Sequence, residues 1–492
     1  MYFVFLNPQG NFDHLDSYWT MHPDFGGQLV YVKEIASALA LLGHKVDIIT
    51  RKFVDSKLSG FEDTFDYYDE TKNPRIVRIE CGPPSFLNKE ELWSYLPEWV
   101  DRIIHFFKKQ NHFPDFVTGH YGDGGYSAVL LKQKTGIPFS FTGHSLGAQK
   151  LEKMSVSKNQ YLDIDEKFHF TSRIHAERLT IENADIIFVS TEQERDEQYV
   201  HPLYIDKSSK PFSETRFVIA PPGANTKTFS EIETLNDPLF YSKFDQILTR
   251  DISTNRLSFP YLVLASRLDS KKNHLGLLKA YALDKSLQAK CNIAISVRGI
   301  DNALIDYSSA KPDEREILDQ MMLVIKTSHL EGMVSFISVN SQNELASIYR
   351  YLAKKKSIFV LTSLYEPFGL APIEAMSSGL PAVVTKNGGP KDVLEESNIK
   401  FGVLVDPFDE IDMAKGIHEM FKNYELYKTL GKERVNQKYT WFATAKTYLS
   451  AFENIIQNNA IHHQNQVFSD FLGLENTKIK ILEFLNSCEV KK

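Results

Sequence analysis

Short apolar segments alternate with helical segments along this chain, and this alternation constrains the fold more than any other feature. The first apolar segment, 2–6, and the next, 45–50, flank a segment in which apolar residues recur at helical spacing from Leu29 to Leu39. Strands that alternate with helices form parallel sheets covered on both faces. The sequence therefore predicts an α/β fold of doubly wound sheets, with right-handed crossovers and ligands beyond the carboxyl ends of the strands.

The pattern occurs in two series, which predicts two domains. The expected strands are 2–6, 45–50, 116–120, 138–142, 185–190 and 216–220 in the first series, and 261–265, 292–297, 334–339, 357–361, 382–385 and 402–405 in the second. Expected helices include 168–183, 343–355 and 441–458. Between the series, Pro221-Pro222-Gly223 and the polar residues 225–228 have the composition of a linker. We therefore expect one domain over 1–222 and a second over 223–436.

Composition excludes several classes of protein. The chain has 492 residues, of which 42% are hydrophobic and 24% charged, as in a soluble globular protein of about two or three domains. Its net charge is −7 and it has no basic tract, so nucleic acid is not an expected partner. No apolar run reaches the roughly 18 residues of a membrane span, and residues 7–10 interrupt the first apolar segment too early for a signal peptide.

The chain has three cysteines, Cys81, Cys291 and Cys488, which are far apart and lack CxxC spacing. This spacing argues against a disulfide framework and against a zinc site. It suits a reducing compartment, so we expect a cytoplasmic protein that has no membrane partner.

The segment 358–389 reads as a βαβ unit. Its loop carries Glu366, Phe368, Gly369, Leu370 and Ala371. Pro372 stands at the expected start of a short helix, 373–378, and Gly379 at its end. The N–H groups and the positive dipole end at such a helix start attract phosphate.

Two carboxylates belong to this unit, Glu366 in the loop and Glu374 in the first helical turn. Neither has a basic neighbour in the sequence. Because a carboxylate repels phosphate, one interpretation is that they accept hydrogen bonds from sugar or ribose hydroxyls. The alternative is that Glu374 favours the helix dipole while Glu366 is a solvated loop residue.

Charged side chains follow other expected strands. Arg267 and Lys272 share the loop after 261–265, where two fixed cations suit a diphosphate whose charge grows as its bond to a sugar breaks. The alternative is a solvated basic loop. His144 follows 138–142, a place where a histidine is commonly a core or hydrogen-bonding residue rather than a base.

Gly26, Gly27 and Gln28 open the first helix. Missing side chains at the two glycines let a ligand lie against the backbone amides, although a flexible helix start has the same composition. The sequence shows no pair of carboxylates recognisable as the acid and base of a hydrolase, and no HExxH or Cys/His metal cluster.

The stretch Glu366-Pro-Phe-Gly-Leu, followed by Glu374, resembles the E-x7-E signature of retaining glycosyltransferases of family 4, the GT-B type, in which two Rossmann-like domains face each other across a cleft. With the GGQ at 26–28 and the His-Ser-Leu-Gly at 144–147, the chain is similar to the sucrose-phosphate synthases over nearly its whole length. In that fold the final helices cross back onto the first domain, which assigns 437–492 to it.

The resemblance implies a role for each matching residue on the donor side. Arg267 and Lys272 would grip the nucleotide diphosphate, Glu366 would position the hexose hydroxyls, and Glu374 would position the ribose. His144 and Gly27 would complete the hexose pocket. Further donor-binding positions implied are Arg298, Asn340, Phe368, Gly369, Leu370 and Ala371.

On the acceptor side, the resemblance implies a site for fructose 6-phosphate. Its expected residues are Gln28, Lys89, Tyr121, Lys150 and Arg173. From the sequence alone, each of them is equally well an ordinary surface residue. Many sucrose-phosphate synthases carry two adjacent arginines where this chain has Ser172-Arg173. One cation fewer weakens the argument for a phosphorylated acceptor.

The activity implied is transfer of glucose from UDP-glucose to fructose 6-phosphate, with no metal and no obligate cofactor. A separate sucrose-phosphate phosphatase would act on the product. The alternatives are another donor such as GDP-mannose, free fructose as the acceptor as in sucrose synthase, a UDP-sugar epimerase of the same architecture, and a sugar-nucleotide-binding regulator without catalysis. The basic residues on the acceptor side argue against the epimerase, which needs no phosphorylated second substrate.

Overall fold

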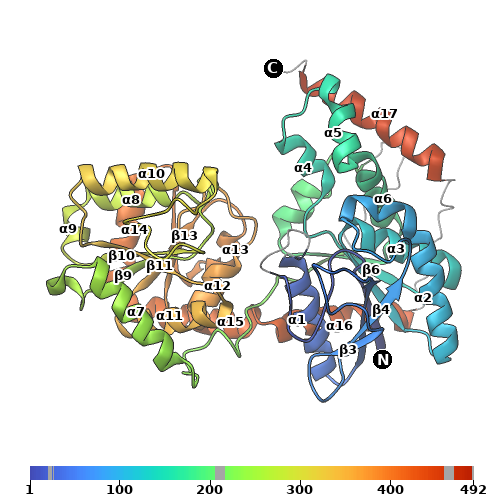
Figure 1. The fold of residues 1–492 in the computed structure, drawn as a ribbon, viewed down its shortest axis with the longest axis horizontal. Coiled ribbons are helices and arrows are strands. Elements are labelled where there is room, and N and C mark those ends of the chain that lie inside the picture. The colour runs from blue at the N-terminus through green and yellow to red at the C-terminus, as the bar shows by residue number, and fades with distance from the viewer. Residues whose placement is uncertain (20–24, 26, 206–215, 459–469, 490–492) are drawn as a thin grey trace. The chain divides into compact units, whose positions relative to one another are not determined.

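The computed structural model describes residues 1–19, 25, 27–205, 216–458 and 470–489. Its residue contacts divide the chain into two compact units, each with its own sheet (Figure 1). The first unit comprises Met1–Pro221 and Thr444–Lys492, and the second comprises Pro222–Ala443. Of the glycine motif predicted at the start of the first helix, Gly26 lies outside the described residues.

The first unit is built on an eight-stranded sheet in the order β3-β4-β2-β1-β5-β6-β7-β8. Its strands are β1 (Tyr2–Leu6), β2 (Lys45–Lys52), β3 (Phe65–Tyr67), β4 (Arg75–Glu80), β5 (Phe116–His120), β6 (Phe139–Thr142), β7 (Ile186–Val189) and β8 (Phe217–Ile219). Neighbouring strands are parallel except β3 and β4. The sequence predicted six of these strands to within two residues, because strands buried on both faces are continuous apolar runs.

Two strands, β3 and β4, were missed because charged residues interrupt them. Arg78 lies in β4 yet is buried, with only 1% of its surface exposed. Its guanidinium donates to Asp66 Oδ2 at 2.8 Å and to the Phe12 carbonyl at 2.6 Å. A buried arginine is tolerated where such partners satisfy it, and a local sequence pattern does not reveal partners from other segments.

Helices cover both faces of the first sheet. They are α1 (Gly27–Leu41), α2 (Leu96–Gln110), α3 (Tyr121–Thr135), α4 (Gly147–Lys153), α5 (Tyr161–Phe168), α6 (Phe170–Asn183), α16 (Trp441–Asn458) and α17 (Asp470–Glu489). The single helix expected over 168–183 is wrong at its start, because His169 adopts φ +50° and separates α5 from α6. No described helix combines the length and the apolar character that crossing a membrane requires.

The chain returns to the first unit through α16. The Tyr448 ring stacks on Phe188 with centroids 3.5 Å apart, and Phe452 stacks on Phe116 at 4.2 Å. The contacts place this return at Thr444 rather than at 437. The difference arises because Ala224 N donates to the Tyr439 carbonyl at 2.8 Å, which keeps this stretch in the second unit.

The second unit contains a six-stranded, all-parallel sheet in the order β11-β10-β9-β12-β13-β16. Its strands are β9 (Tyr261–Leu264), β10 (Asn292–Val297), β11 (Val334–Ser338), β12 (Ile358–Leu361), β13 (Ala382–Thr385) and β16 (Val403–Val405), with a small hairpin of β14 (Glu395–Glu396) and β15 (Ile399–Lys400). Its helices are α7 (Asp237–Asp251), α8 (His274–Leu283), α9 (Lys285–Gln288), α10 (Pro312–Thr327), α11 (Gln342–Lys354), α12 (Leu370–Ser377), α13 (Pro390–Leu394), α14 (Glu410–Lys422) and α15 (Tyr424–Lys438). All six expected strands of this series are present, each to within one residue of its expected ends.

Two glycines after β13 support the loop after β12, residues 362–369, which we call the glutamate loop. Gly388 has φ +101°, and a Cβ atom there would lie 2.0 Å from the Glu366 carbonyl oxygen. Gly389 N donates to that carbonyl at 3.0 Å. Only glycine fits both the positive φ and the close backbone approach at residue 388, so this glycine fixes the path of the glutamate loop.

Substitution of Gly388 by alanine should lower the free energy of unfolding of the second unit by roughly 2–4 kcal/mol, because a fixed backbone atom must move in addition to the φ strain. Gly60 is a matched control, since its φ is +102° and a Cβ atom there would meet nothing within 4 Å. Gly60→Ala should cost only about 1–2 kcal/mol. Urea unfolding of both variants checks this, and equal losses would contradict the steric explanation.

Candidate active site

The glutamate loop leads into α12 through a left-handed cap. Gly369 has φ +91° and stands at the N-cap of α12, which begins at Leu370 rather than at the expected residue 373. Pro372 is therefore the third residue of the helix, where its missing N–H still leaves no backbone acceptor unsatisfied. Phe368 is buried and packs against Tyr439 at 6.0 Å between ring centroids. The first turn of α12, with Leu370 and Ala371, carries the N–H groups that could face a phosphate.

Glu366 and Lys272 meet directly. Lys272 Nζ lies 2.6 Å from Glu366 Oε2, and Ser363 Oγ lies 3.3 Å from the same oxygen. Glu366 is 9% exposed, so solvent screens this ion pair only weakly. The resemblance implies separate ligands for these two residues, and no sequence pattern predicts that they pair.

Backbone contacts between two loops hold this pair in place. We call residues 266–273, after β9, the basic loop. Leu364 N of the glutamate loop donates to the Lys271 carbonyl at 2.8 Å, and Thr362 Oγ1 donates to the Asn273 carbonyl at 3.1 Å. The order of strands β9 and β12, which are neighbours in the sheet, brings the two loops together.

The other predicted donor-site residues of the second unit differ in their surroundings. Arg267 is exposed at the end of β9, and its guanidinium makes no hydrogen bond or ion pair with the described residues. Arg298 and Asn340 are also exposed, after β10 and β11. Asn340 N already donates to Glu344 Oε2 at 2.7 Å. A nucleotide base that binds Asn340 must therefore contact its side chain or its carbonyl group rather than its backbone N–H.

Glu374 is the second predicted carboxylate. It lies in the second turn of α12 rather than in the expected first turn, because the helix begins at Leu370. Burial raises the pKa of its carboxyl to about 8. Within the described part of the chain no hydrogen-bond donor reaches this carboxylate. The buried Tyr349 hydroxyl also lacks a partner there, and burial together with the charge of Glu374 raises the pKa of that phenol. Glu374 is thus available to a ligand hydroxyl.

In the first unit, the predicted hexose residue His144 contacts a residue of the neighbouring parallel strand. His144 follows β6 with φ +56°, and its Nε2 atom lies 2.9 Å from Nδ1 of His120, the last residue of β5. Burial lowers the pKa of His144 to about 3. His120 was not predicted from the sequence, because its contact with His144 joins residues that follow one another only in space, at the ends of separate strands.

The start of α1 lies beyond the end of β1 and carries the other two glycine-motif residues. Gly27 is exposed, and a Cβ atom there would meet nothing within 4 Å. Gln28 Nε2 donates to Oδ1 of the buried Asn7 at 3.0 Å. Asn7 therefore fixes the Gln28 amide, while Gly27 leaves the backbone accessible.

Arg173 is buried and already paired. Its Nε donates to Glu177 Oε1 at 2.9 Å, its Nη2 donates to the Ser145 carbonyl, and its guanidinium covers the Tyr121 ring at 4.7 Å. Glu177 in turn accepts from Gly147 N at 3.0 and 2.9 Å. The structure thus joins Arg173 and Tyr121 to the turn that follows His144.

The two predicted lysines of the acceptor side lie at the surface. Lys150 of α4 is exposed, and its Nζ lies 5.8 Å from the centre of the Phe168 ring. Lys89 is partly exposed and lies 3.8 Å from a carboxylate oxygen of Glu90. Among the described residues, neither lysine forms a hydrogen bond with Arg173.

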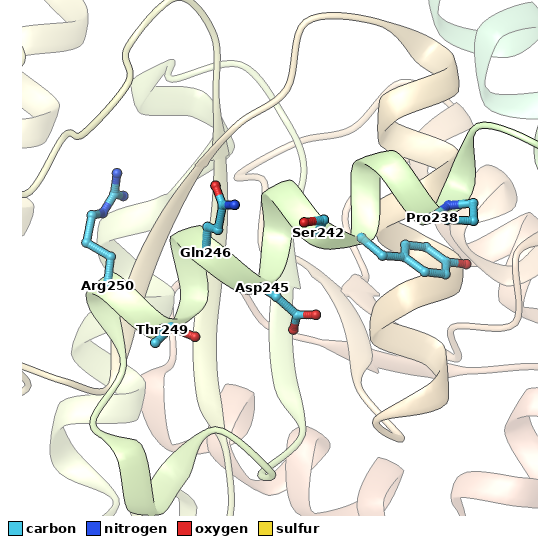
Figure 2. A pocket seen from close by; sticks show the side chains of 7 residues that line it. Pro238, Ser242, Asp245, Gln246, Thr249 and Arg250 are labelled. Carbon is cyan, nitrogen blue, oxygen red and sulfur yellow. The ribbon is translucent and has the colours of Figure 1, made fainter.

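A separate cavity of about 720 Å³ lies along α7 (Figure 2). Figure 2 shows lining side chains that project from this helix, namely Pro238, Ser242, Asp245, Gln246, Thr249 and Arg250. Tyr241 of the same helix also lines the cavity. None of them belongs to the predicted donor or acceptor residues. Among the residues that the structure describes, no group of three or more His, Cys, Asp or Glu side chains is arranged to hold a metal ion.

The raised pKa of Glu374 predicts a pH dependence of stability. In the unfolded chain a glutamate titrates near about 4.3, so the folded state holds this proton more tightly. The protonated carboxyl therefore stabilises the fold fully below about pH 4, and this contribution is lost as the pH rises towards 8. Relative to the wild type, Glu374→Gln should thus become more stable as the pH rises from 5 to 8, by at most about 1.4 kcal/mol for each pH unit.

Urea unfolding across this pH range checks the prediction for Glu374. Glu331→Gln, at an exposed position, is the matched control and should follow the wild-type profile. A Glu374→Gln profile parallel to that of the wild type would show that the buried proton has no such effect.

Comparison with known proteins identifies the family. The family model "Glycosyl transferases group 1" matches residues 245–436, and "Sucrose synthase first GT-B domain" matches 2–200. These matches confirm the predicted GT-B fold class and a glycosyltransferase. A solved sucrose-phosphate synthase from Thermosynechococcus elongatus has the same fold, with a TM-score of 0.62 and 22% identity over 93% of this chain and 100% of that one.

Two relatives in sequence agree with these matches. A probable sucrose-phosphate synthase of Thermosipho melanesiensis is 42% identical over 453 residues, which cover 92% of this chain and 96% of that protein. A probable sucrose-phosphate synthase 1 of Oryza sativa subsp. indica is 31% identical over 481 residues, and the match covers 87% of this chain but only 44% of that longer protein. The chain therefore belongs to the sucrose-phosphate synthase family of GT-B glycosyltransferases.

Proposed function

We propose that this glycosyltransferase transfers glucose from UDP-glucose to fructose 6-phosphate and forms sucrose 6-phosphate and UDP. The observation that carries the proposal is the 42% identity to the Thermosipho relative over almost the full length of both chains. Small sugar substrates also fit the polar candidate residues, which are carboxylates and cations in the second unit and an imidazole in the first, better than they would fit a broad apolar surface. The proposal needs no metal and no obligate cofactor, because protein cations supply the positive charge.

The diphosphate of the donor would lie at the basic loop and the start of α12. When the bond between the hexose C1 and the diphosphate oxygen breaks, negative charge develops on the departing oxygen. Arg267 and Lys272 would stabilise this charge, together with the N–H groups at the start of α12. The 2.6 Å contact with Glu366 supports this role, because the carboxylate holds the Lys272 ammonium in one position before the substrate arrives.

Retention of configuration at C1 follows if the acceptor attacks from the face that the diphosphate leaves. The anomeric hydroxyl oxygen of fructose 6-phosphate forms the new bond to C1, and its proton passes to the departing phosphate oxygen. No enzyme base is required in this scheme. The carboxylate of Glu366 would accept hydrogen bonds from hexose hydroxyls, and Glu374 would bind the ribose hydroxyls.

The phosphate of the acceptor would meet the basic side chains of the first unit. The Arg173 guanidinium already donates hydrogen bonds to Glu177 and Ser145. We therefore propose that Arg173 mainly stabilises the turn at 145–147. Lys89 and Lys150 are closer to the surface and would supply most of the charge that attracts the phosphate. Ser172 beside Arg173 is consistent with a weaker phosphate contact than two adjacent arginines would make.

We further propose a reducing compartment, the cytoplasm, and a phosphatase that consumes the phosphorylated product. The compartment is supported by Cys81 and Cys291, which are buried and unpaired in the structure. The phosphatase follows from chemistry alone, since a phosphomonoester product becomes free sucrose only by hydrolysis.

A panel of substrates tests the proposed reaction. The protein is incubated with UDP-glucose, ADP-glucose or GDP-mannose, each with fructose 6-phosphate or fructose, and the products are identified. We expect UDP release and a phosphorylated disaccharide from UDP-glucose with fructose 6-phosphate. Equal efficiency with free fructose would overturn the phosphate assignment, and an epimerised nucleotide sugar without transfer would overturn the transferase itself.

Removal of the Arg267 guanidinium tests the diphosphate site. Arg267→Ala should lower kcat by about 100-fold to 1,000-fold, as loss of one preorganised charge donor typically does. Lys271→Ala is the matched control, because Lys271 is an exposed cation of the same basic loop that has no predicted role. Steady-state kinetics of both variants check this. Near-normal turnover of Arg267→Ala would remove Arg267 from the site.

A further inference from the structure

A chain of hydrogen bonds leads from the sheet of the first unit to His144. Thr118 Oγ1 lies 3.2 Å from His120 Nε2, and His120 Nδ1 lies 2.9 Å from His144 Nε2. Thr118 and His120 are two residues apart on β5, so their side chains lie on the same face of the strand. We call these three residues the imidazole relay.

Packing holds the imidazole relay in one arrangement. The His120 ring stacks on Phe5 at 5.5 Å, and the Tyr31 ring meets His144 edge-on at 4.9 Å. The Tyr31 hydroxyl is hydrogen-bonded to Tyr448 at 3.0 Å. His144 itself adopts φ +56°, a conformation that costs free energy for a non-glycine residue and persists only where the surroundings impose it. The side chain of His144 is therefore positioned by its neighbours.

Both imidazoles in the relay are neutral. Burial lowers the pKa of His120 well below its usual value and that of His144 to about 3. A neutral imidazole has one N–H donor and one nitrogen that accepts. In each ring of the relay, therefore, one nitrogen donates a hydrogen bond and the other accepts one. The hydrogen-bond partner of one nitrogen decides whether the other carries the proton.

Thr118 determines which nitrogen of each imidazole carries the proton. Its hydroxyl is buried, and within the described residues His120 is its hydrogen-bond partner. A buried hydroxyl proton without an acceptor is costly, so the hydroxyl donates to His120 Nε2. His120 then carries its proton on Nδ1 and donates it to His144 Nε2. It follows that His144 carries its own proton on Nδ1, and no described residue accepts a hydrogen bond from that atom.

We infer that Thr118 and His120 are positioning residues that fix the Nδ1–H tautomer of His144, so that His144 donates a hydrogen bond to a hydroxyl oxygen of the bound hexose. The identity of this ligand rests on the proposed function. With Nε2 occupied by His120 and Nδ1 protonated, His144 has no lone pair for a proton. It therefore acts as a fixed donor and not as a base, which agrees with proton transfer to the departing phosphate.

Nitrogen NMR of the full-length protein with ¹⁵N-labelled histidine tests the tautomer directly. Long-range ¹H–¹⁵N spectra distinguish a protonated from an unprotonated ring nitrogen, and His144→Gln and His120→Gln identify the two signals. We expect both residues with a protonated Nδ1 and an unprotonated Nε2, unchanged from pH 5.5 to pH 8. A His144 ring protonated on Nε2, or on both nitrogens at pH 7, would overturn the inference.

Substitution of Thr118 tests the relay. Thr118→Val removes the hydroxyl at nearly constant volume, so His144 should become a mixture of tautomers. The kcat/KM for UDP-glucose should fall about tenfold, while the KM for fructose 6-phosphate stays within about twofold. Thr118→Ser restores the hydroxyl and should return both the spectrum and the rate to near wild-type values. A Thr118→Val protein with an unchanged His144 signal would contradict the relay.

Thr180→Val is the matched control for a buried threonine. Its hydroxyl donates to the Ala176 carbonyl at 2.7 Å within α6, apart from the relay, so the His144 signals should not change. The two proposals also fail separately. A protein that transfers no sugar yet shows the Nδ1–H tautomer would overturn the proposed function, whereas an active protein with the Nε2–H tautomer would overturn this inference alone.

Discussion

The hydrogen bond from Leu364 N to the Lys271 carbonyl joins the glutamate loop to the basic loop, and these two loops carry the candidate donor-site residues Glu366, Arg267 and Lys272. Without that contact the Lys272 ammonium would lie on an independent surface loop, and Glu366 would be a partly buried carboxylate without a counter-ion. The contact exists because β9 and β12 are neighbours in the sheet, although Leu364 and Lys271 are 93 positions apart in the chain. The order of the strands in the sheet therefore brings the two loops together, and their side chains meet at the candidate site as a result.

The fold was predictable from the sequence wherever burial was continuous. Strands such as β5 and β10 begin and end where expected, since a parallel strand covered on both faces must be apolar along its length. Predictions failed where a polar residue is buried by a distant partner, as Arg78 is in β4, or where one residue leaves the regular conformation, as His169 does between α5 and α6. A local sequence pattern reveals neither a partner from another segment nor the backbone conformation of a single residue.

For the candidate site, too, some features were predictable from the sequence and others were not. The positions of Arg267 and His144 at strand ends were readable from the chain, because each stands directly after an apolar run. Their partners were not. The Lys272–Glu366 pair joins residues 94 apart, and the His120–His144 contact joins two strands. Arg173 makes the point most clearly, because a residue expected to bind phosphate is buried against Glu177. Sequence position indicated the region of Arg173 but not its partner.

The two units prepare their polar groups by opposite means. In the second unit a carboxylate contacts and orients the Lys272 side chain, whereas in the first unit burial lowers the pKa of His144. Both arrangements position a polar group before a substrate binds, so neither side chain has to reorganise while charge develops. The proposed reaction, in which the departing phosphate takes the acceptor proton, would use both features. Fixed cations would stabilise the negative charge that develops, and the imidazole would donate a hydrogen bond without removing the proton.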